Sequence, residues 1–457
     1  MNLVWLRKDL RLQDHPALKA ALDNGKTQLL FIDTEKQWVL HNESKISIEF
    51  RRRRVNSLKS EATALGITVD VLNAEDFKDI PDVLKTYCIE NSIQNVYFTK
   101  ETPWDESMRD EQALKKLNQQ DIQVHALAYD LFVSQPVFNL SGLPFKVFTP
   151  FYKKWMSMLD SVENWQRYKI KPTQKTSKTE PPYSSNSSFD KVLENYPTSS
   201  LEIKEILNQF CETKIFNYQL ERDYPNLEST SRLSAYLTYG MIGPRQLLTA
   251  IKTAHDARQT EWKTDFWLRE LAWRDFYRQL MIHFPRINKN LEFKKIDIKW
   301  NNNPQNVEAW KNGMTGFPII DAAMRQLNQT GWMHNRLRML TASFFTKLMF
   351  EDWRLGEQYF MQTLIDGEFS ANNGGWQWSA STGCDAAPYF RVFNPTAQSE
   401  KFDKDGEFIK RFVPELRVFN SKNTHNPNSM ERNQCNYPQP IIDYKSARLA
   451  AIDAFRK

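Results

Sequence analysis

The sequence predicts an α/β N-terminal domain with a doubly wound, five-stranded parallel sheet, followed by a larger all-α C-terminal domain. Two observations indicate this fold class. Over residues 1–133, short apolar runs alternate with longer amphipathic segments. Beyond residue 200, the apolar residues recur at helical spacing, and no convincing series of alternating strands follows.

Five short runs in the first domain are expected to be strands, because most are rich in Val, Ile and aromatic residues. They are LVWL (3–6), TQLLFI (27–32), ITVDVL (67–72), NVYFT (95–99) and QVHAL (123–127). The amphipathic segments between them are expected to be helices, at residues 15–25, 47–66, 77–92 and 104–120. Strands that alternate with helices form a parallel sheet covered on both faces, which binds ligands at the carboxyl ends of its strands.

This first domain lacks both common phosphate-binding loops. No GxGxxG follows Leu6, and GxxxxGK(S/T) occurs nowhere in the chain. The densest basic run, Arg51 to Arg54, spreads around a whole helical turn. We expect a solvated helix here, with a binding role as the alternative.

Residues 165–200 are rich in Lys, Ser, Thr and Pro and poor in large aliphatic residues, which predicts a linker that is mobile or lies over the surface. The expected organisation is an α/β domain at 1–133, an interdomain linker at 134–200 and the all-α domain at 201–457.

Composition excludes a disordered, collagen-like or disulfide-rich chain: 41% of the 457 residues are hydrophobic and 25% are charged. The four cysteines show no CxxC or zinc-ribbon spacing, so no metal site is expected. No apolar stretch approaches the roughly 18 residues of a membrane span, and no signal-peptide pattern is present. We therefore expect a cytoplasmic monomer.

The second part of the chain is the more basic one. Residues 201–457 hold 34 of the 61 Lys and Arg, 29 of the 55 Asp and Glu, and nine of the 14 tryptophans. This balance favours contact with an anion, and ordinary solubility charge around a large aromatic core is the alternative.

A hydroxyl-rich segment, Thr230-Ser231-Arg232-Leu233-Ser234, precedes an apolar-periodic run. Free N–H groups, hydroxyls and the positive end of a helix dipole together suit a phosphate. Plain N-capping is the alternative.

The segment FWLRELAWRDFYRQL forms a helix face on which a carboxylate and a guanidinium lie among aromatic rings. Trp267, Glu270, Trp273, Arg274 and Tyr277 fall within an arc of about 120°. A core face would not normally carry Glu and Arg, so the pattern indicates a ligand site. A solvated i, i+4 pair is the alternative.

Two later segments also indicate a polar ligand wall. Asn335, Arg338 and Met339 share an arc of about 100° on one predicted helix. The uncharged stretch from Phe369 to Cys384 is too polar for a core helix and too aromatic for a solvated loop. Its Gly375 would let backbone approach a flat ring.

Long strings in this chain resemble those of the photolyase and cryptochrome family. They are VWLRKDLRLQDHPAL, RLSAYL, FWLRELAWRDFYR, MTGFPIIDAAMRQLNQTGWMHNRLRM, DWRLGEQYF and LIDGEFSANNGGWQWSASTGCDAAPYFRVFNPTAQSEKFD. Met314 replaces the family's Lys in the fourth string. The resemblance spans essentially the whole chain and is greatest to class I cyclobutane pyrimidine dimer photolyases.

The resemblance implies a carbon–carbon lyase that repairs pyrimidine dimers in UV-damaged DNA. Light-excited reduced FAD would pass an electron to a flipped-out dimer and recover it afterwards. The residues implied to hold FAD are Tyr218, Thr230, Ser231, Arg232, Leu233, Ser234, Trp267, Glu270, Arg274, Asn335, Arg338, Asp366, Glu368 and Asn372. Asn372 would lie near flavin N5, and Glu368 stands where many relatives have Asp.

The resemblance also implies a lesion pocket, an electron route and an antenna. Glu270, Asn335, Met339 and Asn372 would be catalytic, and the lesion and its DNA would meet Glu270, Trp273, Arg336, Met339 and Trp378. Electrons would reach the flavin through Trp300, Trp353 and Trp376. Glu106 and Lys289 match positions that contact methenyltetrahydrofolate in relatives, whereas Asp105 and Asn288 stand where the best-known folate binders have Asn and Cys. The resemblance implies a folate antenna at these four residues, with a deazaflavin or no antenna as alternatives.

Two other activities are known in this family. A cryptochrome-type blue-light sensor of plants typically has Asp where Asn372 stands, and a (6-4) photolyase usually has His where Asn335 stands. An amide cannot donate a proton as a histidine does, and the adjacent His334 would point about 100° away. These two residues favour repair of cyclobutane dimers.

Overall fold

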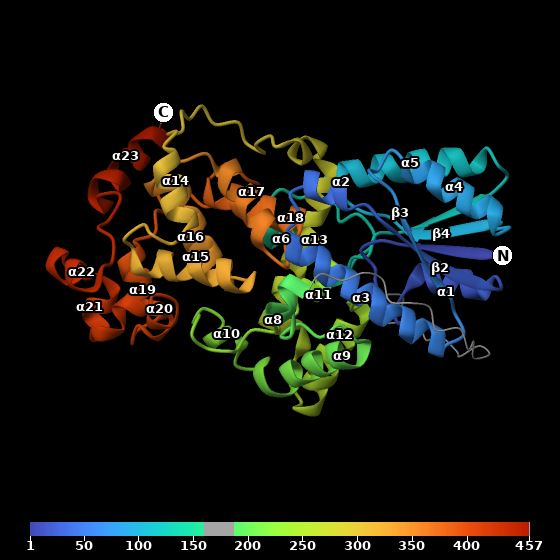
Figure 1. The fold of residues 1–457 in the computed structure, drawn as a ribbon, viewed down its shortest axis with the longest axis horizontal. Helices are drawn as coiled ribbons and strands as arrows, with labels where there is room; N and C mark the ends of the chain where they lie inside the picture. Colours follow the sequence, from blue (N-terminus) through green and yellow to red (C-terminus); the bar gives the residue numbers. More distant parts are fainter. Residues whose placement is uncertain (160–186, 457) are drawn as a thin grey trace. The chain divides into compact units, whose positions relative to one another are not determined.

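The computed structural model describes residues 1–159 and 187–456 (Figure 1). Contacts divide these residues into two compact units. The first comprises Met1–Phe216 with Ser231–Asn288, and the second Asn217–Thr230 with Lys289–Lys457. The domain limits at residues 133 and 200 remain predictions.

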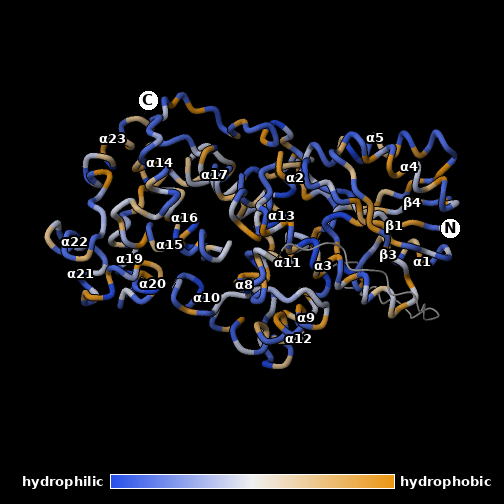
Figure 2. The backbone as a smooth tube through the Cα atoms, viewed as in Figure 1, coloured by the Kyte–Doolittle hydropathy of each residue, from blue (hydrophilic) through white to orange (hydrophobic). Residues whose placement is uncertain are grey.

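A five-stranded parallel sheet forms the core of the N-terminal part of the first unit, as predicted. Its strands are β1 (Asn2–Leu6), β2 (Thr27–Asp33), β3 (Val69–Asn73), β4 (Asn95–Thr99) and β5 (Gln123–Leu127). The order is β3-β2-β1-β4-β5. Every residue of β1 and β2 is buried, and most of these residues are apolar, as expected for strands buried on both faces. Figure 2 shows hydrophobic colour along much of β1.

The helices that alternate with these strands also match the prediction, with one addition. They are α1 (Pro16–Asp23), α2 (Glu35–Leu40), α3 (Lys45–Ala64), α4 (Ile80–Glu90) and α5 (Trp104–Asn118). The sequence did not reveal α2, because its six residues are too few to show helical spacing.

The expectation of a solvated helix at the four-arginine run is wrong for two of its members. On α3, Arg51 and Arg54 are only 2% and 0% exposed. Arg51 pairs with Glu43, and its guanidinium lies 3.8 Å from the ring centroid of Trp38. Arg54 donates to both carboxylate oxygens of Glu61, at 2.8 and 2.9 Å. These arginines are buried because carboxylates eight and seven residues away along the chain pair with them.

The rest of the first unit is helical. Its longer helices are α6 (Phe148–Leu159), α9 (Ser200–Gln209), α12 (Pro244–Ala257) and α13 (Phe266–His283), and the short α8 (Asp190–Leu193) and α11 (Ser234–Thr238) lie between them. Helix α6 falls inside the segment predicted as a linker, and packs against α13. Most of the Lys-, Ser- and Pro-rich stretch lies outside the described residues.

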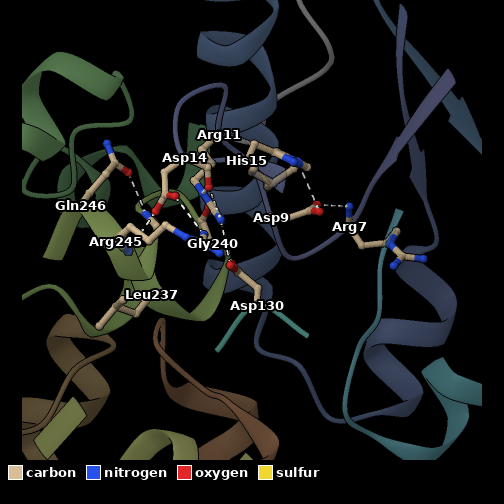
Figure 3. Close-up of polar contacts among 12 residues, drawn as sticks. Arg7, Asp9, Arg11, Asp14, His15, Asp130, Leu237, Gly240, Arg245 and Gln246 are labelled. Atoms are coloured by element: carbon tan, nitrogen blue, oxygen red, sulfur yellow. Dashed lines mark hydrogen bonds and ion pairs between the residues drawn. The ribbon is translucent and has the colours of Figure 1, made fainter. Parts of the chain in front are cut away.

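A buried polar junction connects the loop after β1 to the segment around α11 and α12 (Figure 3). Arg11 donates to both carboxylate oxygens of Asp130, at 2.7 and 2.8 Å, and to the carbonyls of Asp14 and Gly240. The Asp14 carboxylate in turn accepts from the backbone N–H and the guanidinium of Arg245, each at 3.0 Å. A Cβ on Gly240 would lie 2.2 Å from a backbone oxygen of the loop, so only glycine fits this approach.

The second unit is all-α in its described residues, which confirms the predicted class. Its main helices are α10 (Tyr218–Glu221), α14 (Pro304–Lys311), α15 (Pro318–Thr330), α16 (Asn335–Ser343), α17 (Trp353–Thr363), α18 (Phe369–Ser379), α19 (Pro395–Phe402), α20 (Glu407–Phe412), α21 (Ser421–His425), α22 (Ser429–Cys435) and α23 (Tyr444–Arg456). Its core contains the buried rings of Trp310, Trp353 and Trp376. None of the described helices combines the length and the apolar character needed to cross a membrane.

Replacing Arg11 by Ala should destabilise the first unit by about 3–5 kcal/mol, because it leaves Asp130 buried without its guanidinium. Urea denaturation followed by circular dichroism measures this loss. The control is Lys19→Ala, which removes an exposed i, i+4 pair with Asp23 and should cost no more than about 1 kcal/mol. Equal losses in the two variants would contradict the central role of Arg11.

Candidate functional site

A cavity of about 150 Å³ in the second unit is built from α16, α17, α18 and the turn before α18. It brings together residues that the sequence singled out in separate segments. The lining residues are Asn335, Arg338, Met339, Ala342, Phe360, Leu364, Asp366, Gly367, Glu368, Ala371, Asn372, Gly375, Trp376 and Ser379. The predicted ligand walls at 335–339 and 366–376 therefore line a single cavity.

The charge on this wall is fixed by an ion pair. The Arg338 guanidinium donates to both oxygens of the Asp366 carboxylate, at 3.0 and 2.8 Å. Its Nε also donates to the carbonyl of Met333, at 2.8 Å. The Asp366 side chain is only 2% exposed, so the pair gives a buried carboxylate a matched cation beside the cavity.

The orientation of the Asn372 amide follows from its one side-chain hydrogen bond. Its Nδ2 donates to the backbone carbonyl of Glu357, at 2.9 Å. The carbonyl Oδ1 makes no hydrogen bond within the described part of the chain. Asn372 thus offers a neutral acceptor to a ligand in the cavity.

A buried carboxyl group lies behind Asn372. Glu357 accepts a hydrogen bond from Asn373 Nδ2 at 2.8 Å, and Asn373 Oδ1 accepts from Gln377 Nε2 at 2.9 Å. Burial raises the pKa of Glu357 to about 7. The burial of Glu357 could not be predicted from the sequence, because a glutamate within DWRLGEQYF has the pattern of a surface position.

Two glycines shape the space around the tryptophan on α18. A Cβ on Gly375 would meet nothing within 4 Å, so this position leaves the cavity wall open. A Cβ on Gly356 of α17 would lie 2.1 Å from the Trp376 ring, so only glycine lets that indole pack there. Trp376 is consequently buried between α17 and the cavity.

The three tryptophans of the implied electron route all lie in the second unit. Trp353 and Trp376 are buried, and Trp300 is partly exposed. Trp376 also makes edge-to-face contacts with Phe360 and Trp310, with ring centroids 5.0 and 6.0 Å apart. Trp300 packs against Phe350 at 5.3 Å.

Helix α13 of the first unit carries the second predicted constellation. Trp267 is buried, and Arg274 donates to the Leu237 carbonyl at 3.0 Å. Trp273 lies face to face with Phe148 of α6, with ring centroids 3.6 Å apart and planes inclined by 6°. Sequence analysis missed Phe148, and the apolar periodicity of VFTPFYKKW was the signal that could have found it.

The hydroxyl-rich segment does not cap its helix in the simple way considered as the alternative. The cap of α11 is Leu233, which has no hydroxyl, and Ser231 Oγ accepts only from the Leu233 N–H at 3.4 Å. Ser234 is exposed in the first turn, while Thr230 belongs to the second unit together with the buried Tyr218. Simple N-capping therefore does not explain these hydroxyls.

Arg336, which was expected to contact DNA, forms contacts within the second unit. Arg336 donates to the Asp223 carboxylate at 2.6 Å and lies 4.7 Å from the ring centroid of Phe402. His334 is buried, and burial lowers its pKa to about 4, so it is neutral at physiological pH.

The expected antenna residues of α5 lie at the carboxyl end of the sheet. The exposed Asp105 pairs with His41 at 3.2 Å. Glu106 is buried, lies 3.8 Å from Lys8 Nζ, and burial raises its pKa. Glu106 faces a cavity of about 20 Å³, which fits a water molecule but not a folate.

The other two antenna residues lie at the boundary between the two units. Asn288 ends the last segment of the first unit, and its Nδ2 donates to the Met281 carbonyl at 3.1 Å. Lys289 begins the main segment of the second unit. Within the described residues, no group of three His, Cys, Asp or Glu side chains could hold a metal ion.

Comparison with known proteins identifies the family. Residues 2–174 match the model of DNA photolyase, and residues 267–457 match the model of the FAD binding domain of DNA photolyase. The deoxyribodipyrimidine photo-lyase of Escherichia coli K12 is 40% identical over 479 aligned residues, covering 100% of this chain and 99% of the relative. The chain belongs to the DNA photolyase family.

Solved structures of photolyases share the fold. The class III photolyase of Agrobacterium tumefaciens is 30% identical, with a TM-score of 0.85 over 100% of this chain and 97% of its own. The archaeal photolyase of Sulfolobus tokodaii, solved with two FAD molecules, is 28% identical, with a TM-score of 0.76 over 100% of both chains.

Glu357 makes the stability of this photolyase depend on pH. Its carboxyl group has a pKa of about 7 in the folded chain and ionises near 4.5 in the unfolded one. The folded state therefore holds the extra proton between these values, and stability should fall as pH rises from 4.5 to 7, by on the order of 3 kcal/mol.

Glu357→Gln should remove this dependence, because an amide mimics the protonated acid. Thermal midpoints at pH 5 and pH 8 measure the effect in the wild type and the variant. Glu308→Gln, which alters an exposed carboxylate, is the control. A Glu357→Gln variant with the wild-type pH dependence would show that Glu357 ionises normally.

Proposed function

We propose that this photolyase uses light and FAD to split cyclobutane pyrimidine dimers in UV-damaged DNA. The observation that carries the proposal is the cavity wall of the second unit. It combines a fixed Arg338–Asp366 pair with a neutral acceptor, Asn372, inside the segment that matches the FAD binding domain. The full-length relative from Escherichia coli carries the corresponding name.

The donor set of the cavity fits a flavin. A flavin ring has both hydrogen-bond donors and acceptors at its edge, and the wall supplies a guanidinium, carboxylates and an amide. Ser379 adds a buried hydroxyl with no hydrogen-bond partner in the described chain, and a bound ring could satisfy it. The open position at Gly375 leaves room for a planar group to approach α18.

Bound reduced FAD would supply, on absorbing light, the electron that opens the cyclobutane ring, and would recover it after the ring splits. In the second unit, Arg338, Asp366, Glu368, Asn335 and Asn372 would orient the ring. Asn372 Oδ1 would accept a hydrogen bond from a protonated nitrogen of the ring. Around the phosphates and the rest of the cofactor we propose Tyr218, Thr230, Ser231, Arg232, Leu233, Ser234, Trp267 and Arg274.

The lesion would be bound by stacking and by one carboxylate. Flipping a dimer out of the duplex costs a few kcal/mol, and least for a distorted lesion. Trp273 and Trp378 would offset this cost, since stacking on an aromatic ring contributes about 1–3 kcal/mol per base. Glu270 would accept a hydrogen bond from the pyrimidine edge. Met339 and Asn335 are proposed as further contacts of the lesion.

The remaining assignments rest on the family resemblance. Trp376, Trp353 and Trp300 would carry electrons from the surface to the flavin site. A folate antenna would bind near Asp105, Asn288 and Lys289, outside the small cavity that Glu106 faces. The neutral His334 and the amide of Asn335 favour cyclobutane repair over (6-4) chemistry, which needs a proton donor.

Illumination of the reduced protein with a thymine-dimer oligonucleotide tests the proposal. Thymine absorbance should recover in the light and not in the dark. A protein that contains FAD but restores no absorbance would contradict repair, and one that cannot bind FAD would contradict the cofactor assignment.

Glu270→Ala should weaken binding of the dimer oligonucleotide about tenfold or more while FAD stays bound, because a hydrogen bond to a charged group contributes about 1.5–3 kcal/mol. Repair per absorbed photon should fall with it. Glu205→Ala, which changes an exposed carboxylate on α9, is the control. Unchanged repair in Glu270→Ala would remove Glu270 from the mechanism.

A further inference from the structure

Helix α6 presents a stripe of buried aromatic residues to α13 within the first unit. Phe148, Phe151 and Trp155 lie three and four residues apart and are 1%, 1% and 0% exposed. Phe148 meets Trp273, and Phe151 meets Phe276 at 5.0 Å. No role beyond packing follows from the stripe itself. Both phenylalanines contact Phe276, but only Phe148 also stacks on Trp273.

The contact of Phe148 with Trp273 is a full stack. The centroids are 3.6 Å apart and the planes are inclined by only 6°, so one face of the indole is covered. Tyr277 lies beside Trp273 at 5.5 Å and 29°, which is too far for full overlap. Trp273 is nevertheless partly exposed, so the stack leaves part of the indole accessible.

The register between the two helices is locked by a buried carboxylate. Asp275 is 0% exposed, and its Oδ2 accepts from Trp155 Nε1 at 2.9 Å and from the Val133 N–H at 3.0 Å. These bonds fix α6 along α13, so Phe148 cannot slide away from Trp273. Phe148 is thereby held rigidly behind the indole.

A cation extends this stack on the exposed side of the helices. The Arg269 guanidinium lies 5.6 Å from the Phe148 ring centroid and 5.8 Å from that of Tyr152. Phe148 and Tyr152 stack on each other at 5.7 Å and 23°. Phe148 itself is buried, so the accessible parts of this column are those of Tyr152 and Trp273. Aromatic rings with a cation beside them are the kind of group on which unpaired bases stack.

We propose that Phe148 is a positioning residue for lesion binding. By covering one face of Trp273, it holds the indole in a single orientation that presents the remaining surface to a flipped-out pyrimidine dimer. The inference rests on the proposed function and deepens it, because it makes the discrimination of damaged from undamaged DNA depend on a residue that need not touch DNA.

The test compares two equally buried phenylalanines of the same helix. Phe148→Leu removes the ring behind Trp273, and Phe151→Leu removes the ring against Phe276. Each keeps an apolar side chain. The measurements are thermal stability, FAD content, and dissociation constants for matched oligonucleotides with and without a thymine dimer.

Phe148→Leu should weaken binding of the dimer oligonucleotide by about two- to tenfold, the range expected for loss of one aromatic pair. Binding of undamaged DNA and the FAD content should stay unchanged. Phe148→Tyr should restore the affinity for the dimer. Phe151→Leu should lower thermal stability without changing the ratio of the two dissociation constants.

An unchanged ratio in Phe148→Leu, or an equal change in Phe151→Leu, would overturn the proposal. Should Phe148→Leu not fold, Phe148→Met replaces it, since a flexible thioether fills the ring's volume without stacking as a ring does. A wild-type protein that binds FAD but does not prefer dimer-containing DNA would instead contradict the proposed function.

Discussion

The ion pair between Arg338 and Asp366 is the interaction on which the cavity of the second unit depends. Burying a carboxylate without a matched cation is costly. One guanidinium nitrogen of Arg338 donates to both oxygens of Asp366, and the Nε of Arg338 donates to the Met333 carbonyl, so the direction of the guanidinium is fixed. Because one end of the pair lies on α16 and the other on the turn before α18, the pair sets the separation of the two walls.

The rest of that wall combines the Glu368 carboxylate with neutral groups, the amides of Asn335 and Asn372 and the hydroxyl of Ser379. The direction of the Asn372 amide has a structural cause, because its Nδ2 donates to the Glu357 carbonyl. Burial raises the pKa of the Glu357 carboxyl itself to about 7, so this group is protonated below neutral pH. A wall with both donors and acceptors suits a ring that has both at its edge.

Most of the sheet could be predicted closely from the sequence, because the strands of a covered parallel sheet contain short runs of apolar residues. The limits of β1, β2, β4 and β5 fall within one residue of the expected ones. Helical spacing likewise identified α13, α16 and the residues that these helices present. The spacing of apolar residues along the chain predicts a helix and its buried face, and distant contacts are not needed for that prediction.

Features that depend on distant partners could not be predicted in the same way. Arg54 donates to the carbonyl of Thr198, 144 residues away, and the Arg51 guanidinium lies 4.6 Å from the ring centroid of Tyr239. A run of four arginines does not reveal such partners. Glu357 appeared to be an ordinary surface residue for the same reason. Helix α6 was missed because it adjoins a Lys- and Pro-rich stretch whose composition dominated the interpretation of the whole segment.

Helix α13 has one face in the core of the first unit and also carries residues that are proposed to bind the lesion. Asp275, Phe276 and Gln279 face the interior of the first unit, where Asp275 and Gln279 accept hydrogen bonds from the backbone of Val133 and Val137. These buried polar anchors fix the rotation of the helix about its axis, because any turn would leave a carboxylate or an amide without its partner. The direction of Glu270 and Trp273 on the same helix is then determined by the core. The buried core thus orients the residues proposed to bind the lesion. Their orientation depends on contacts inside the protein that DNA does not touch.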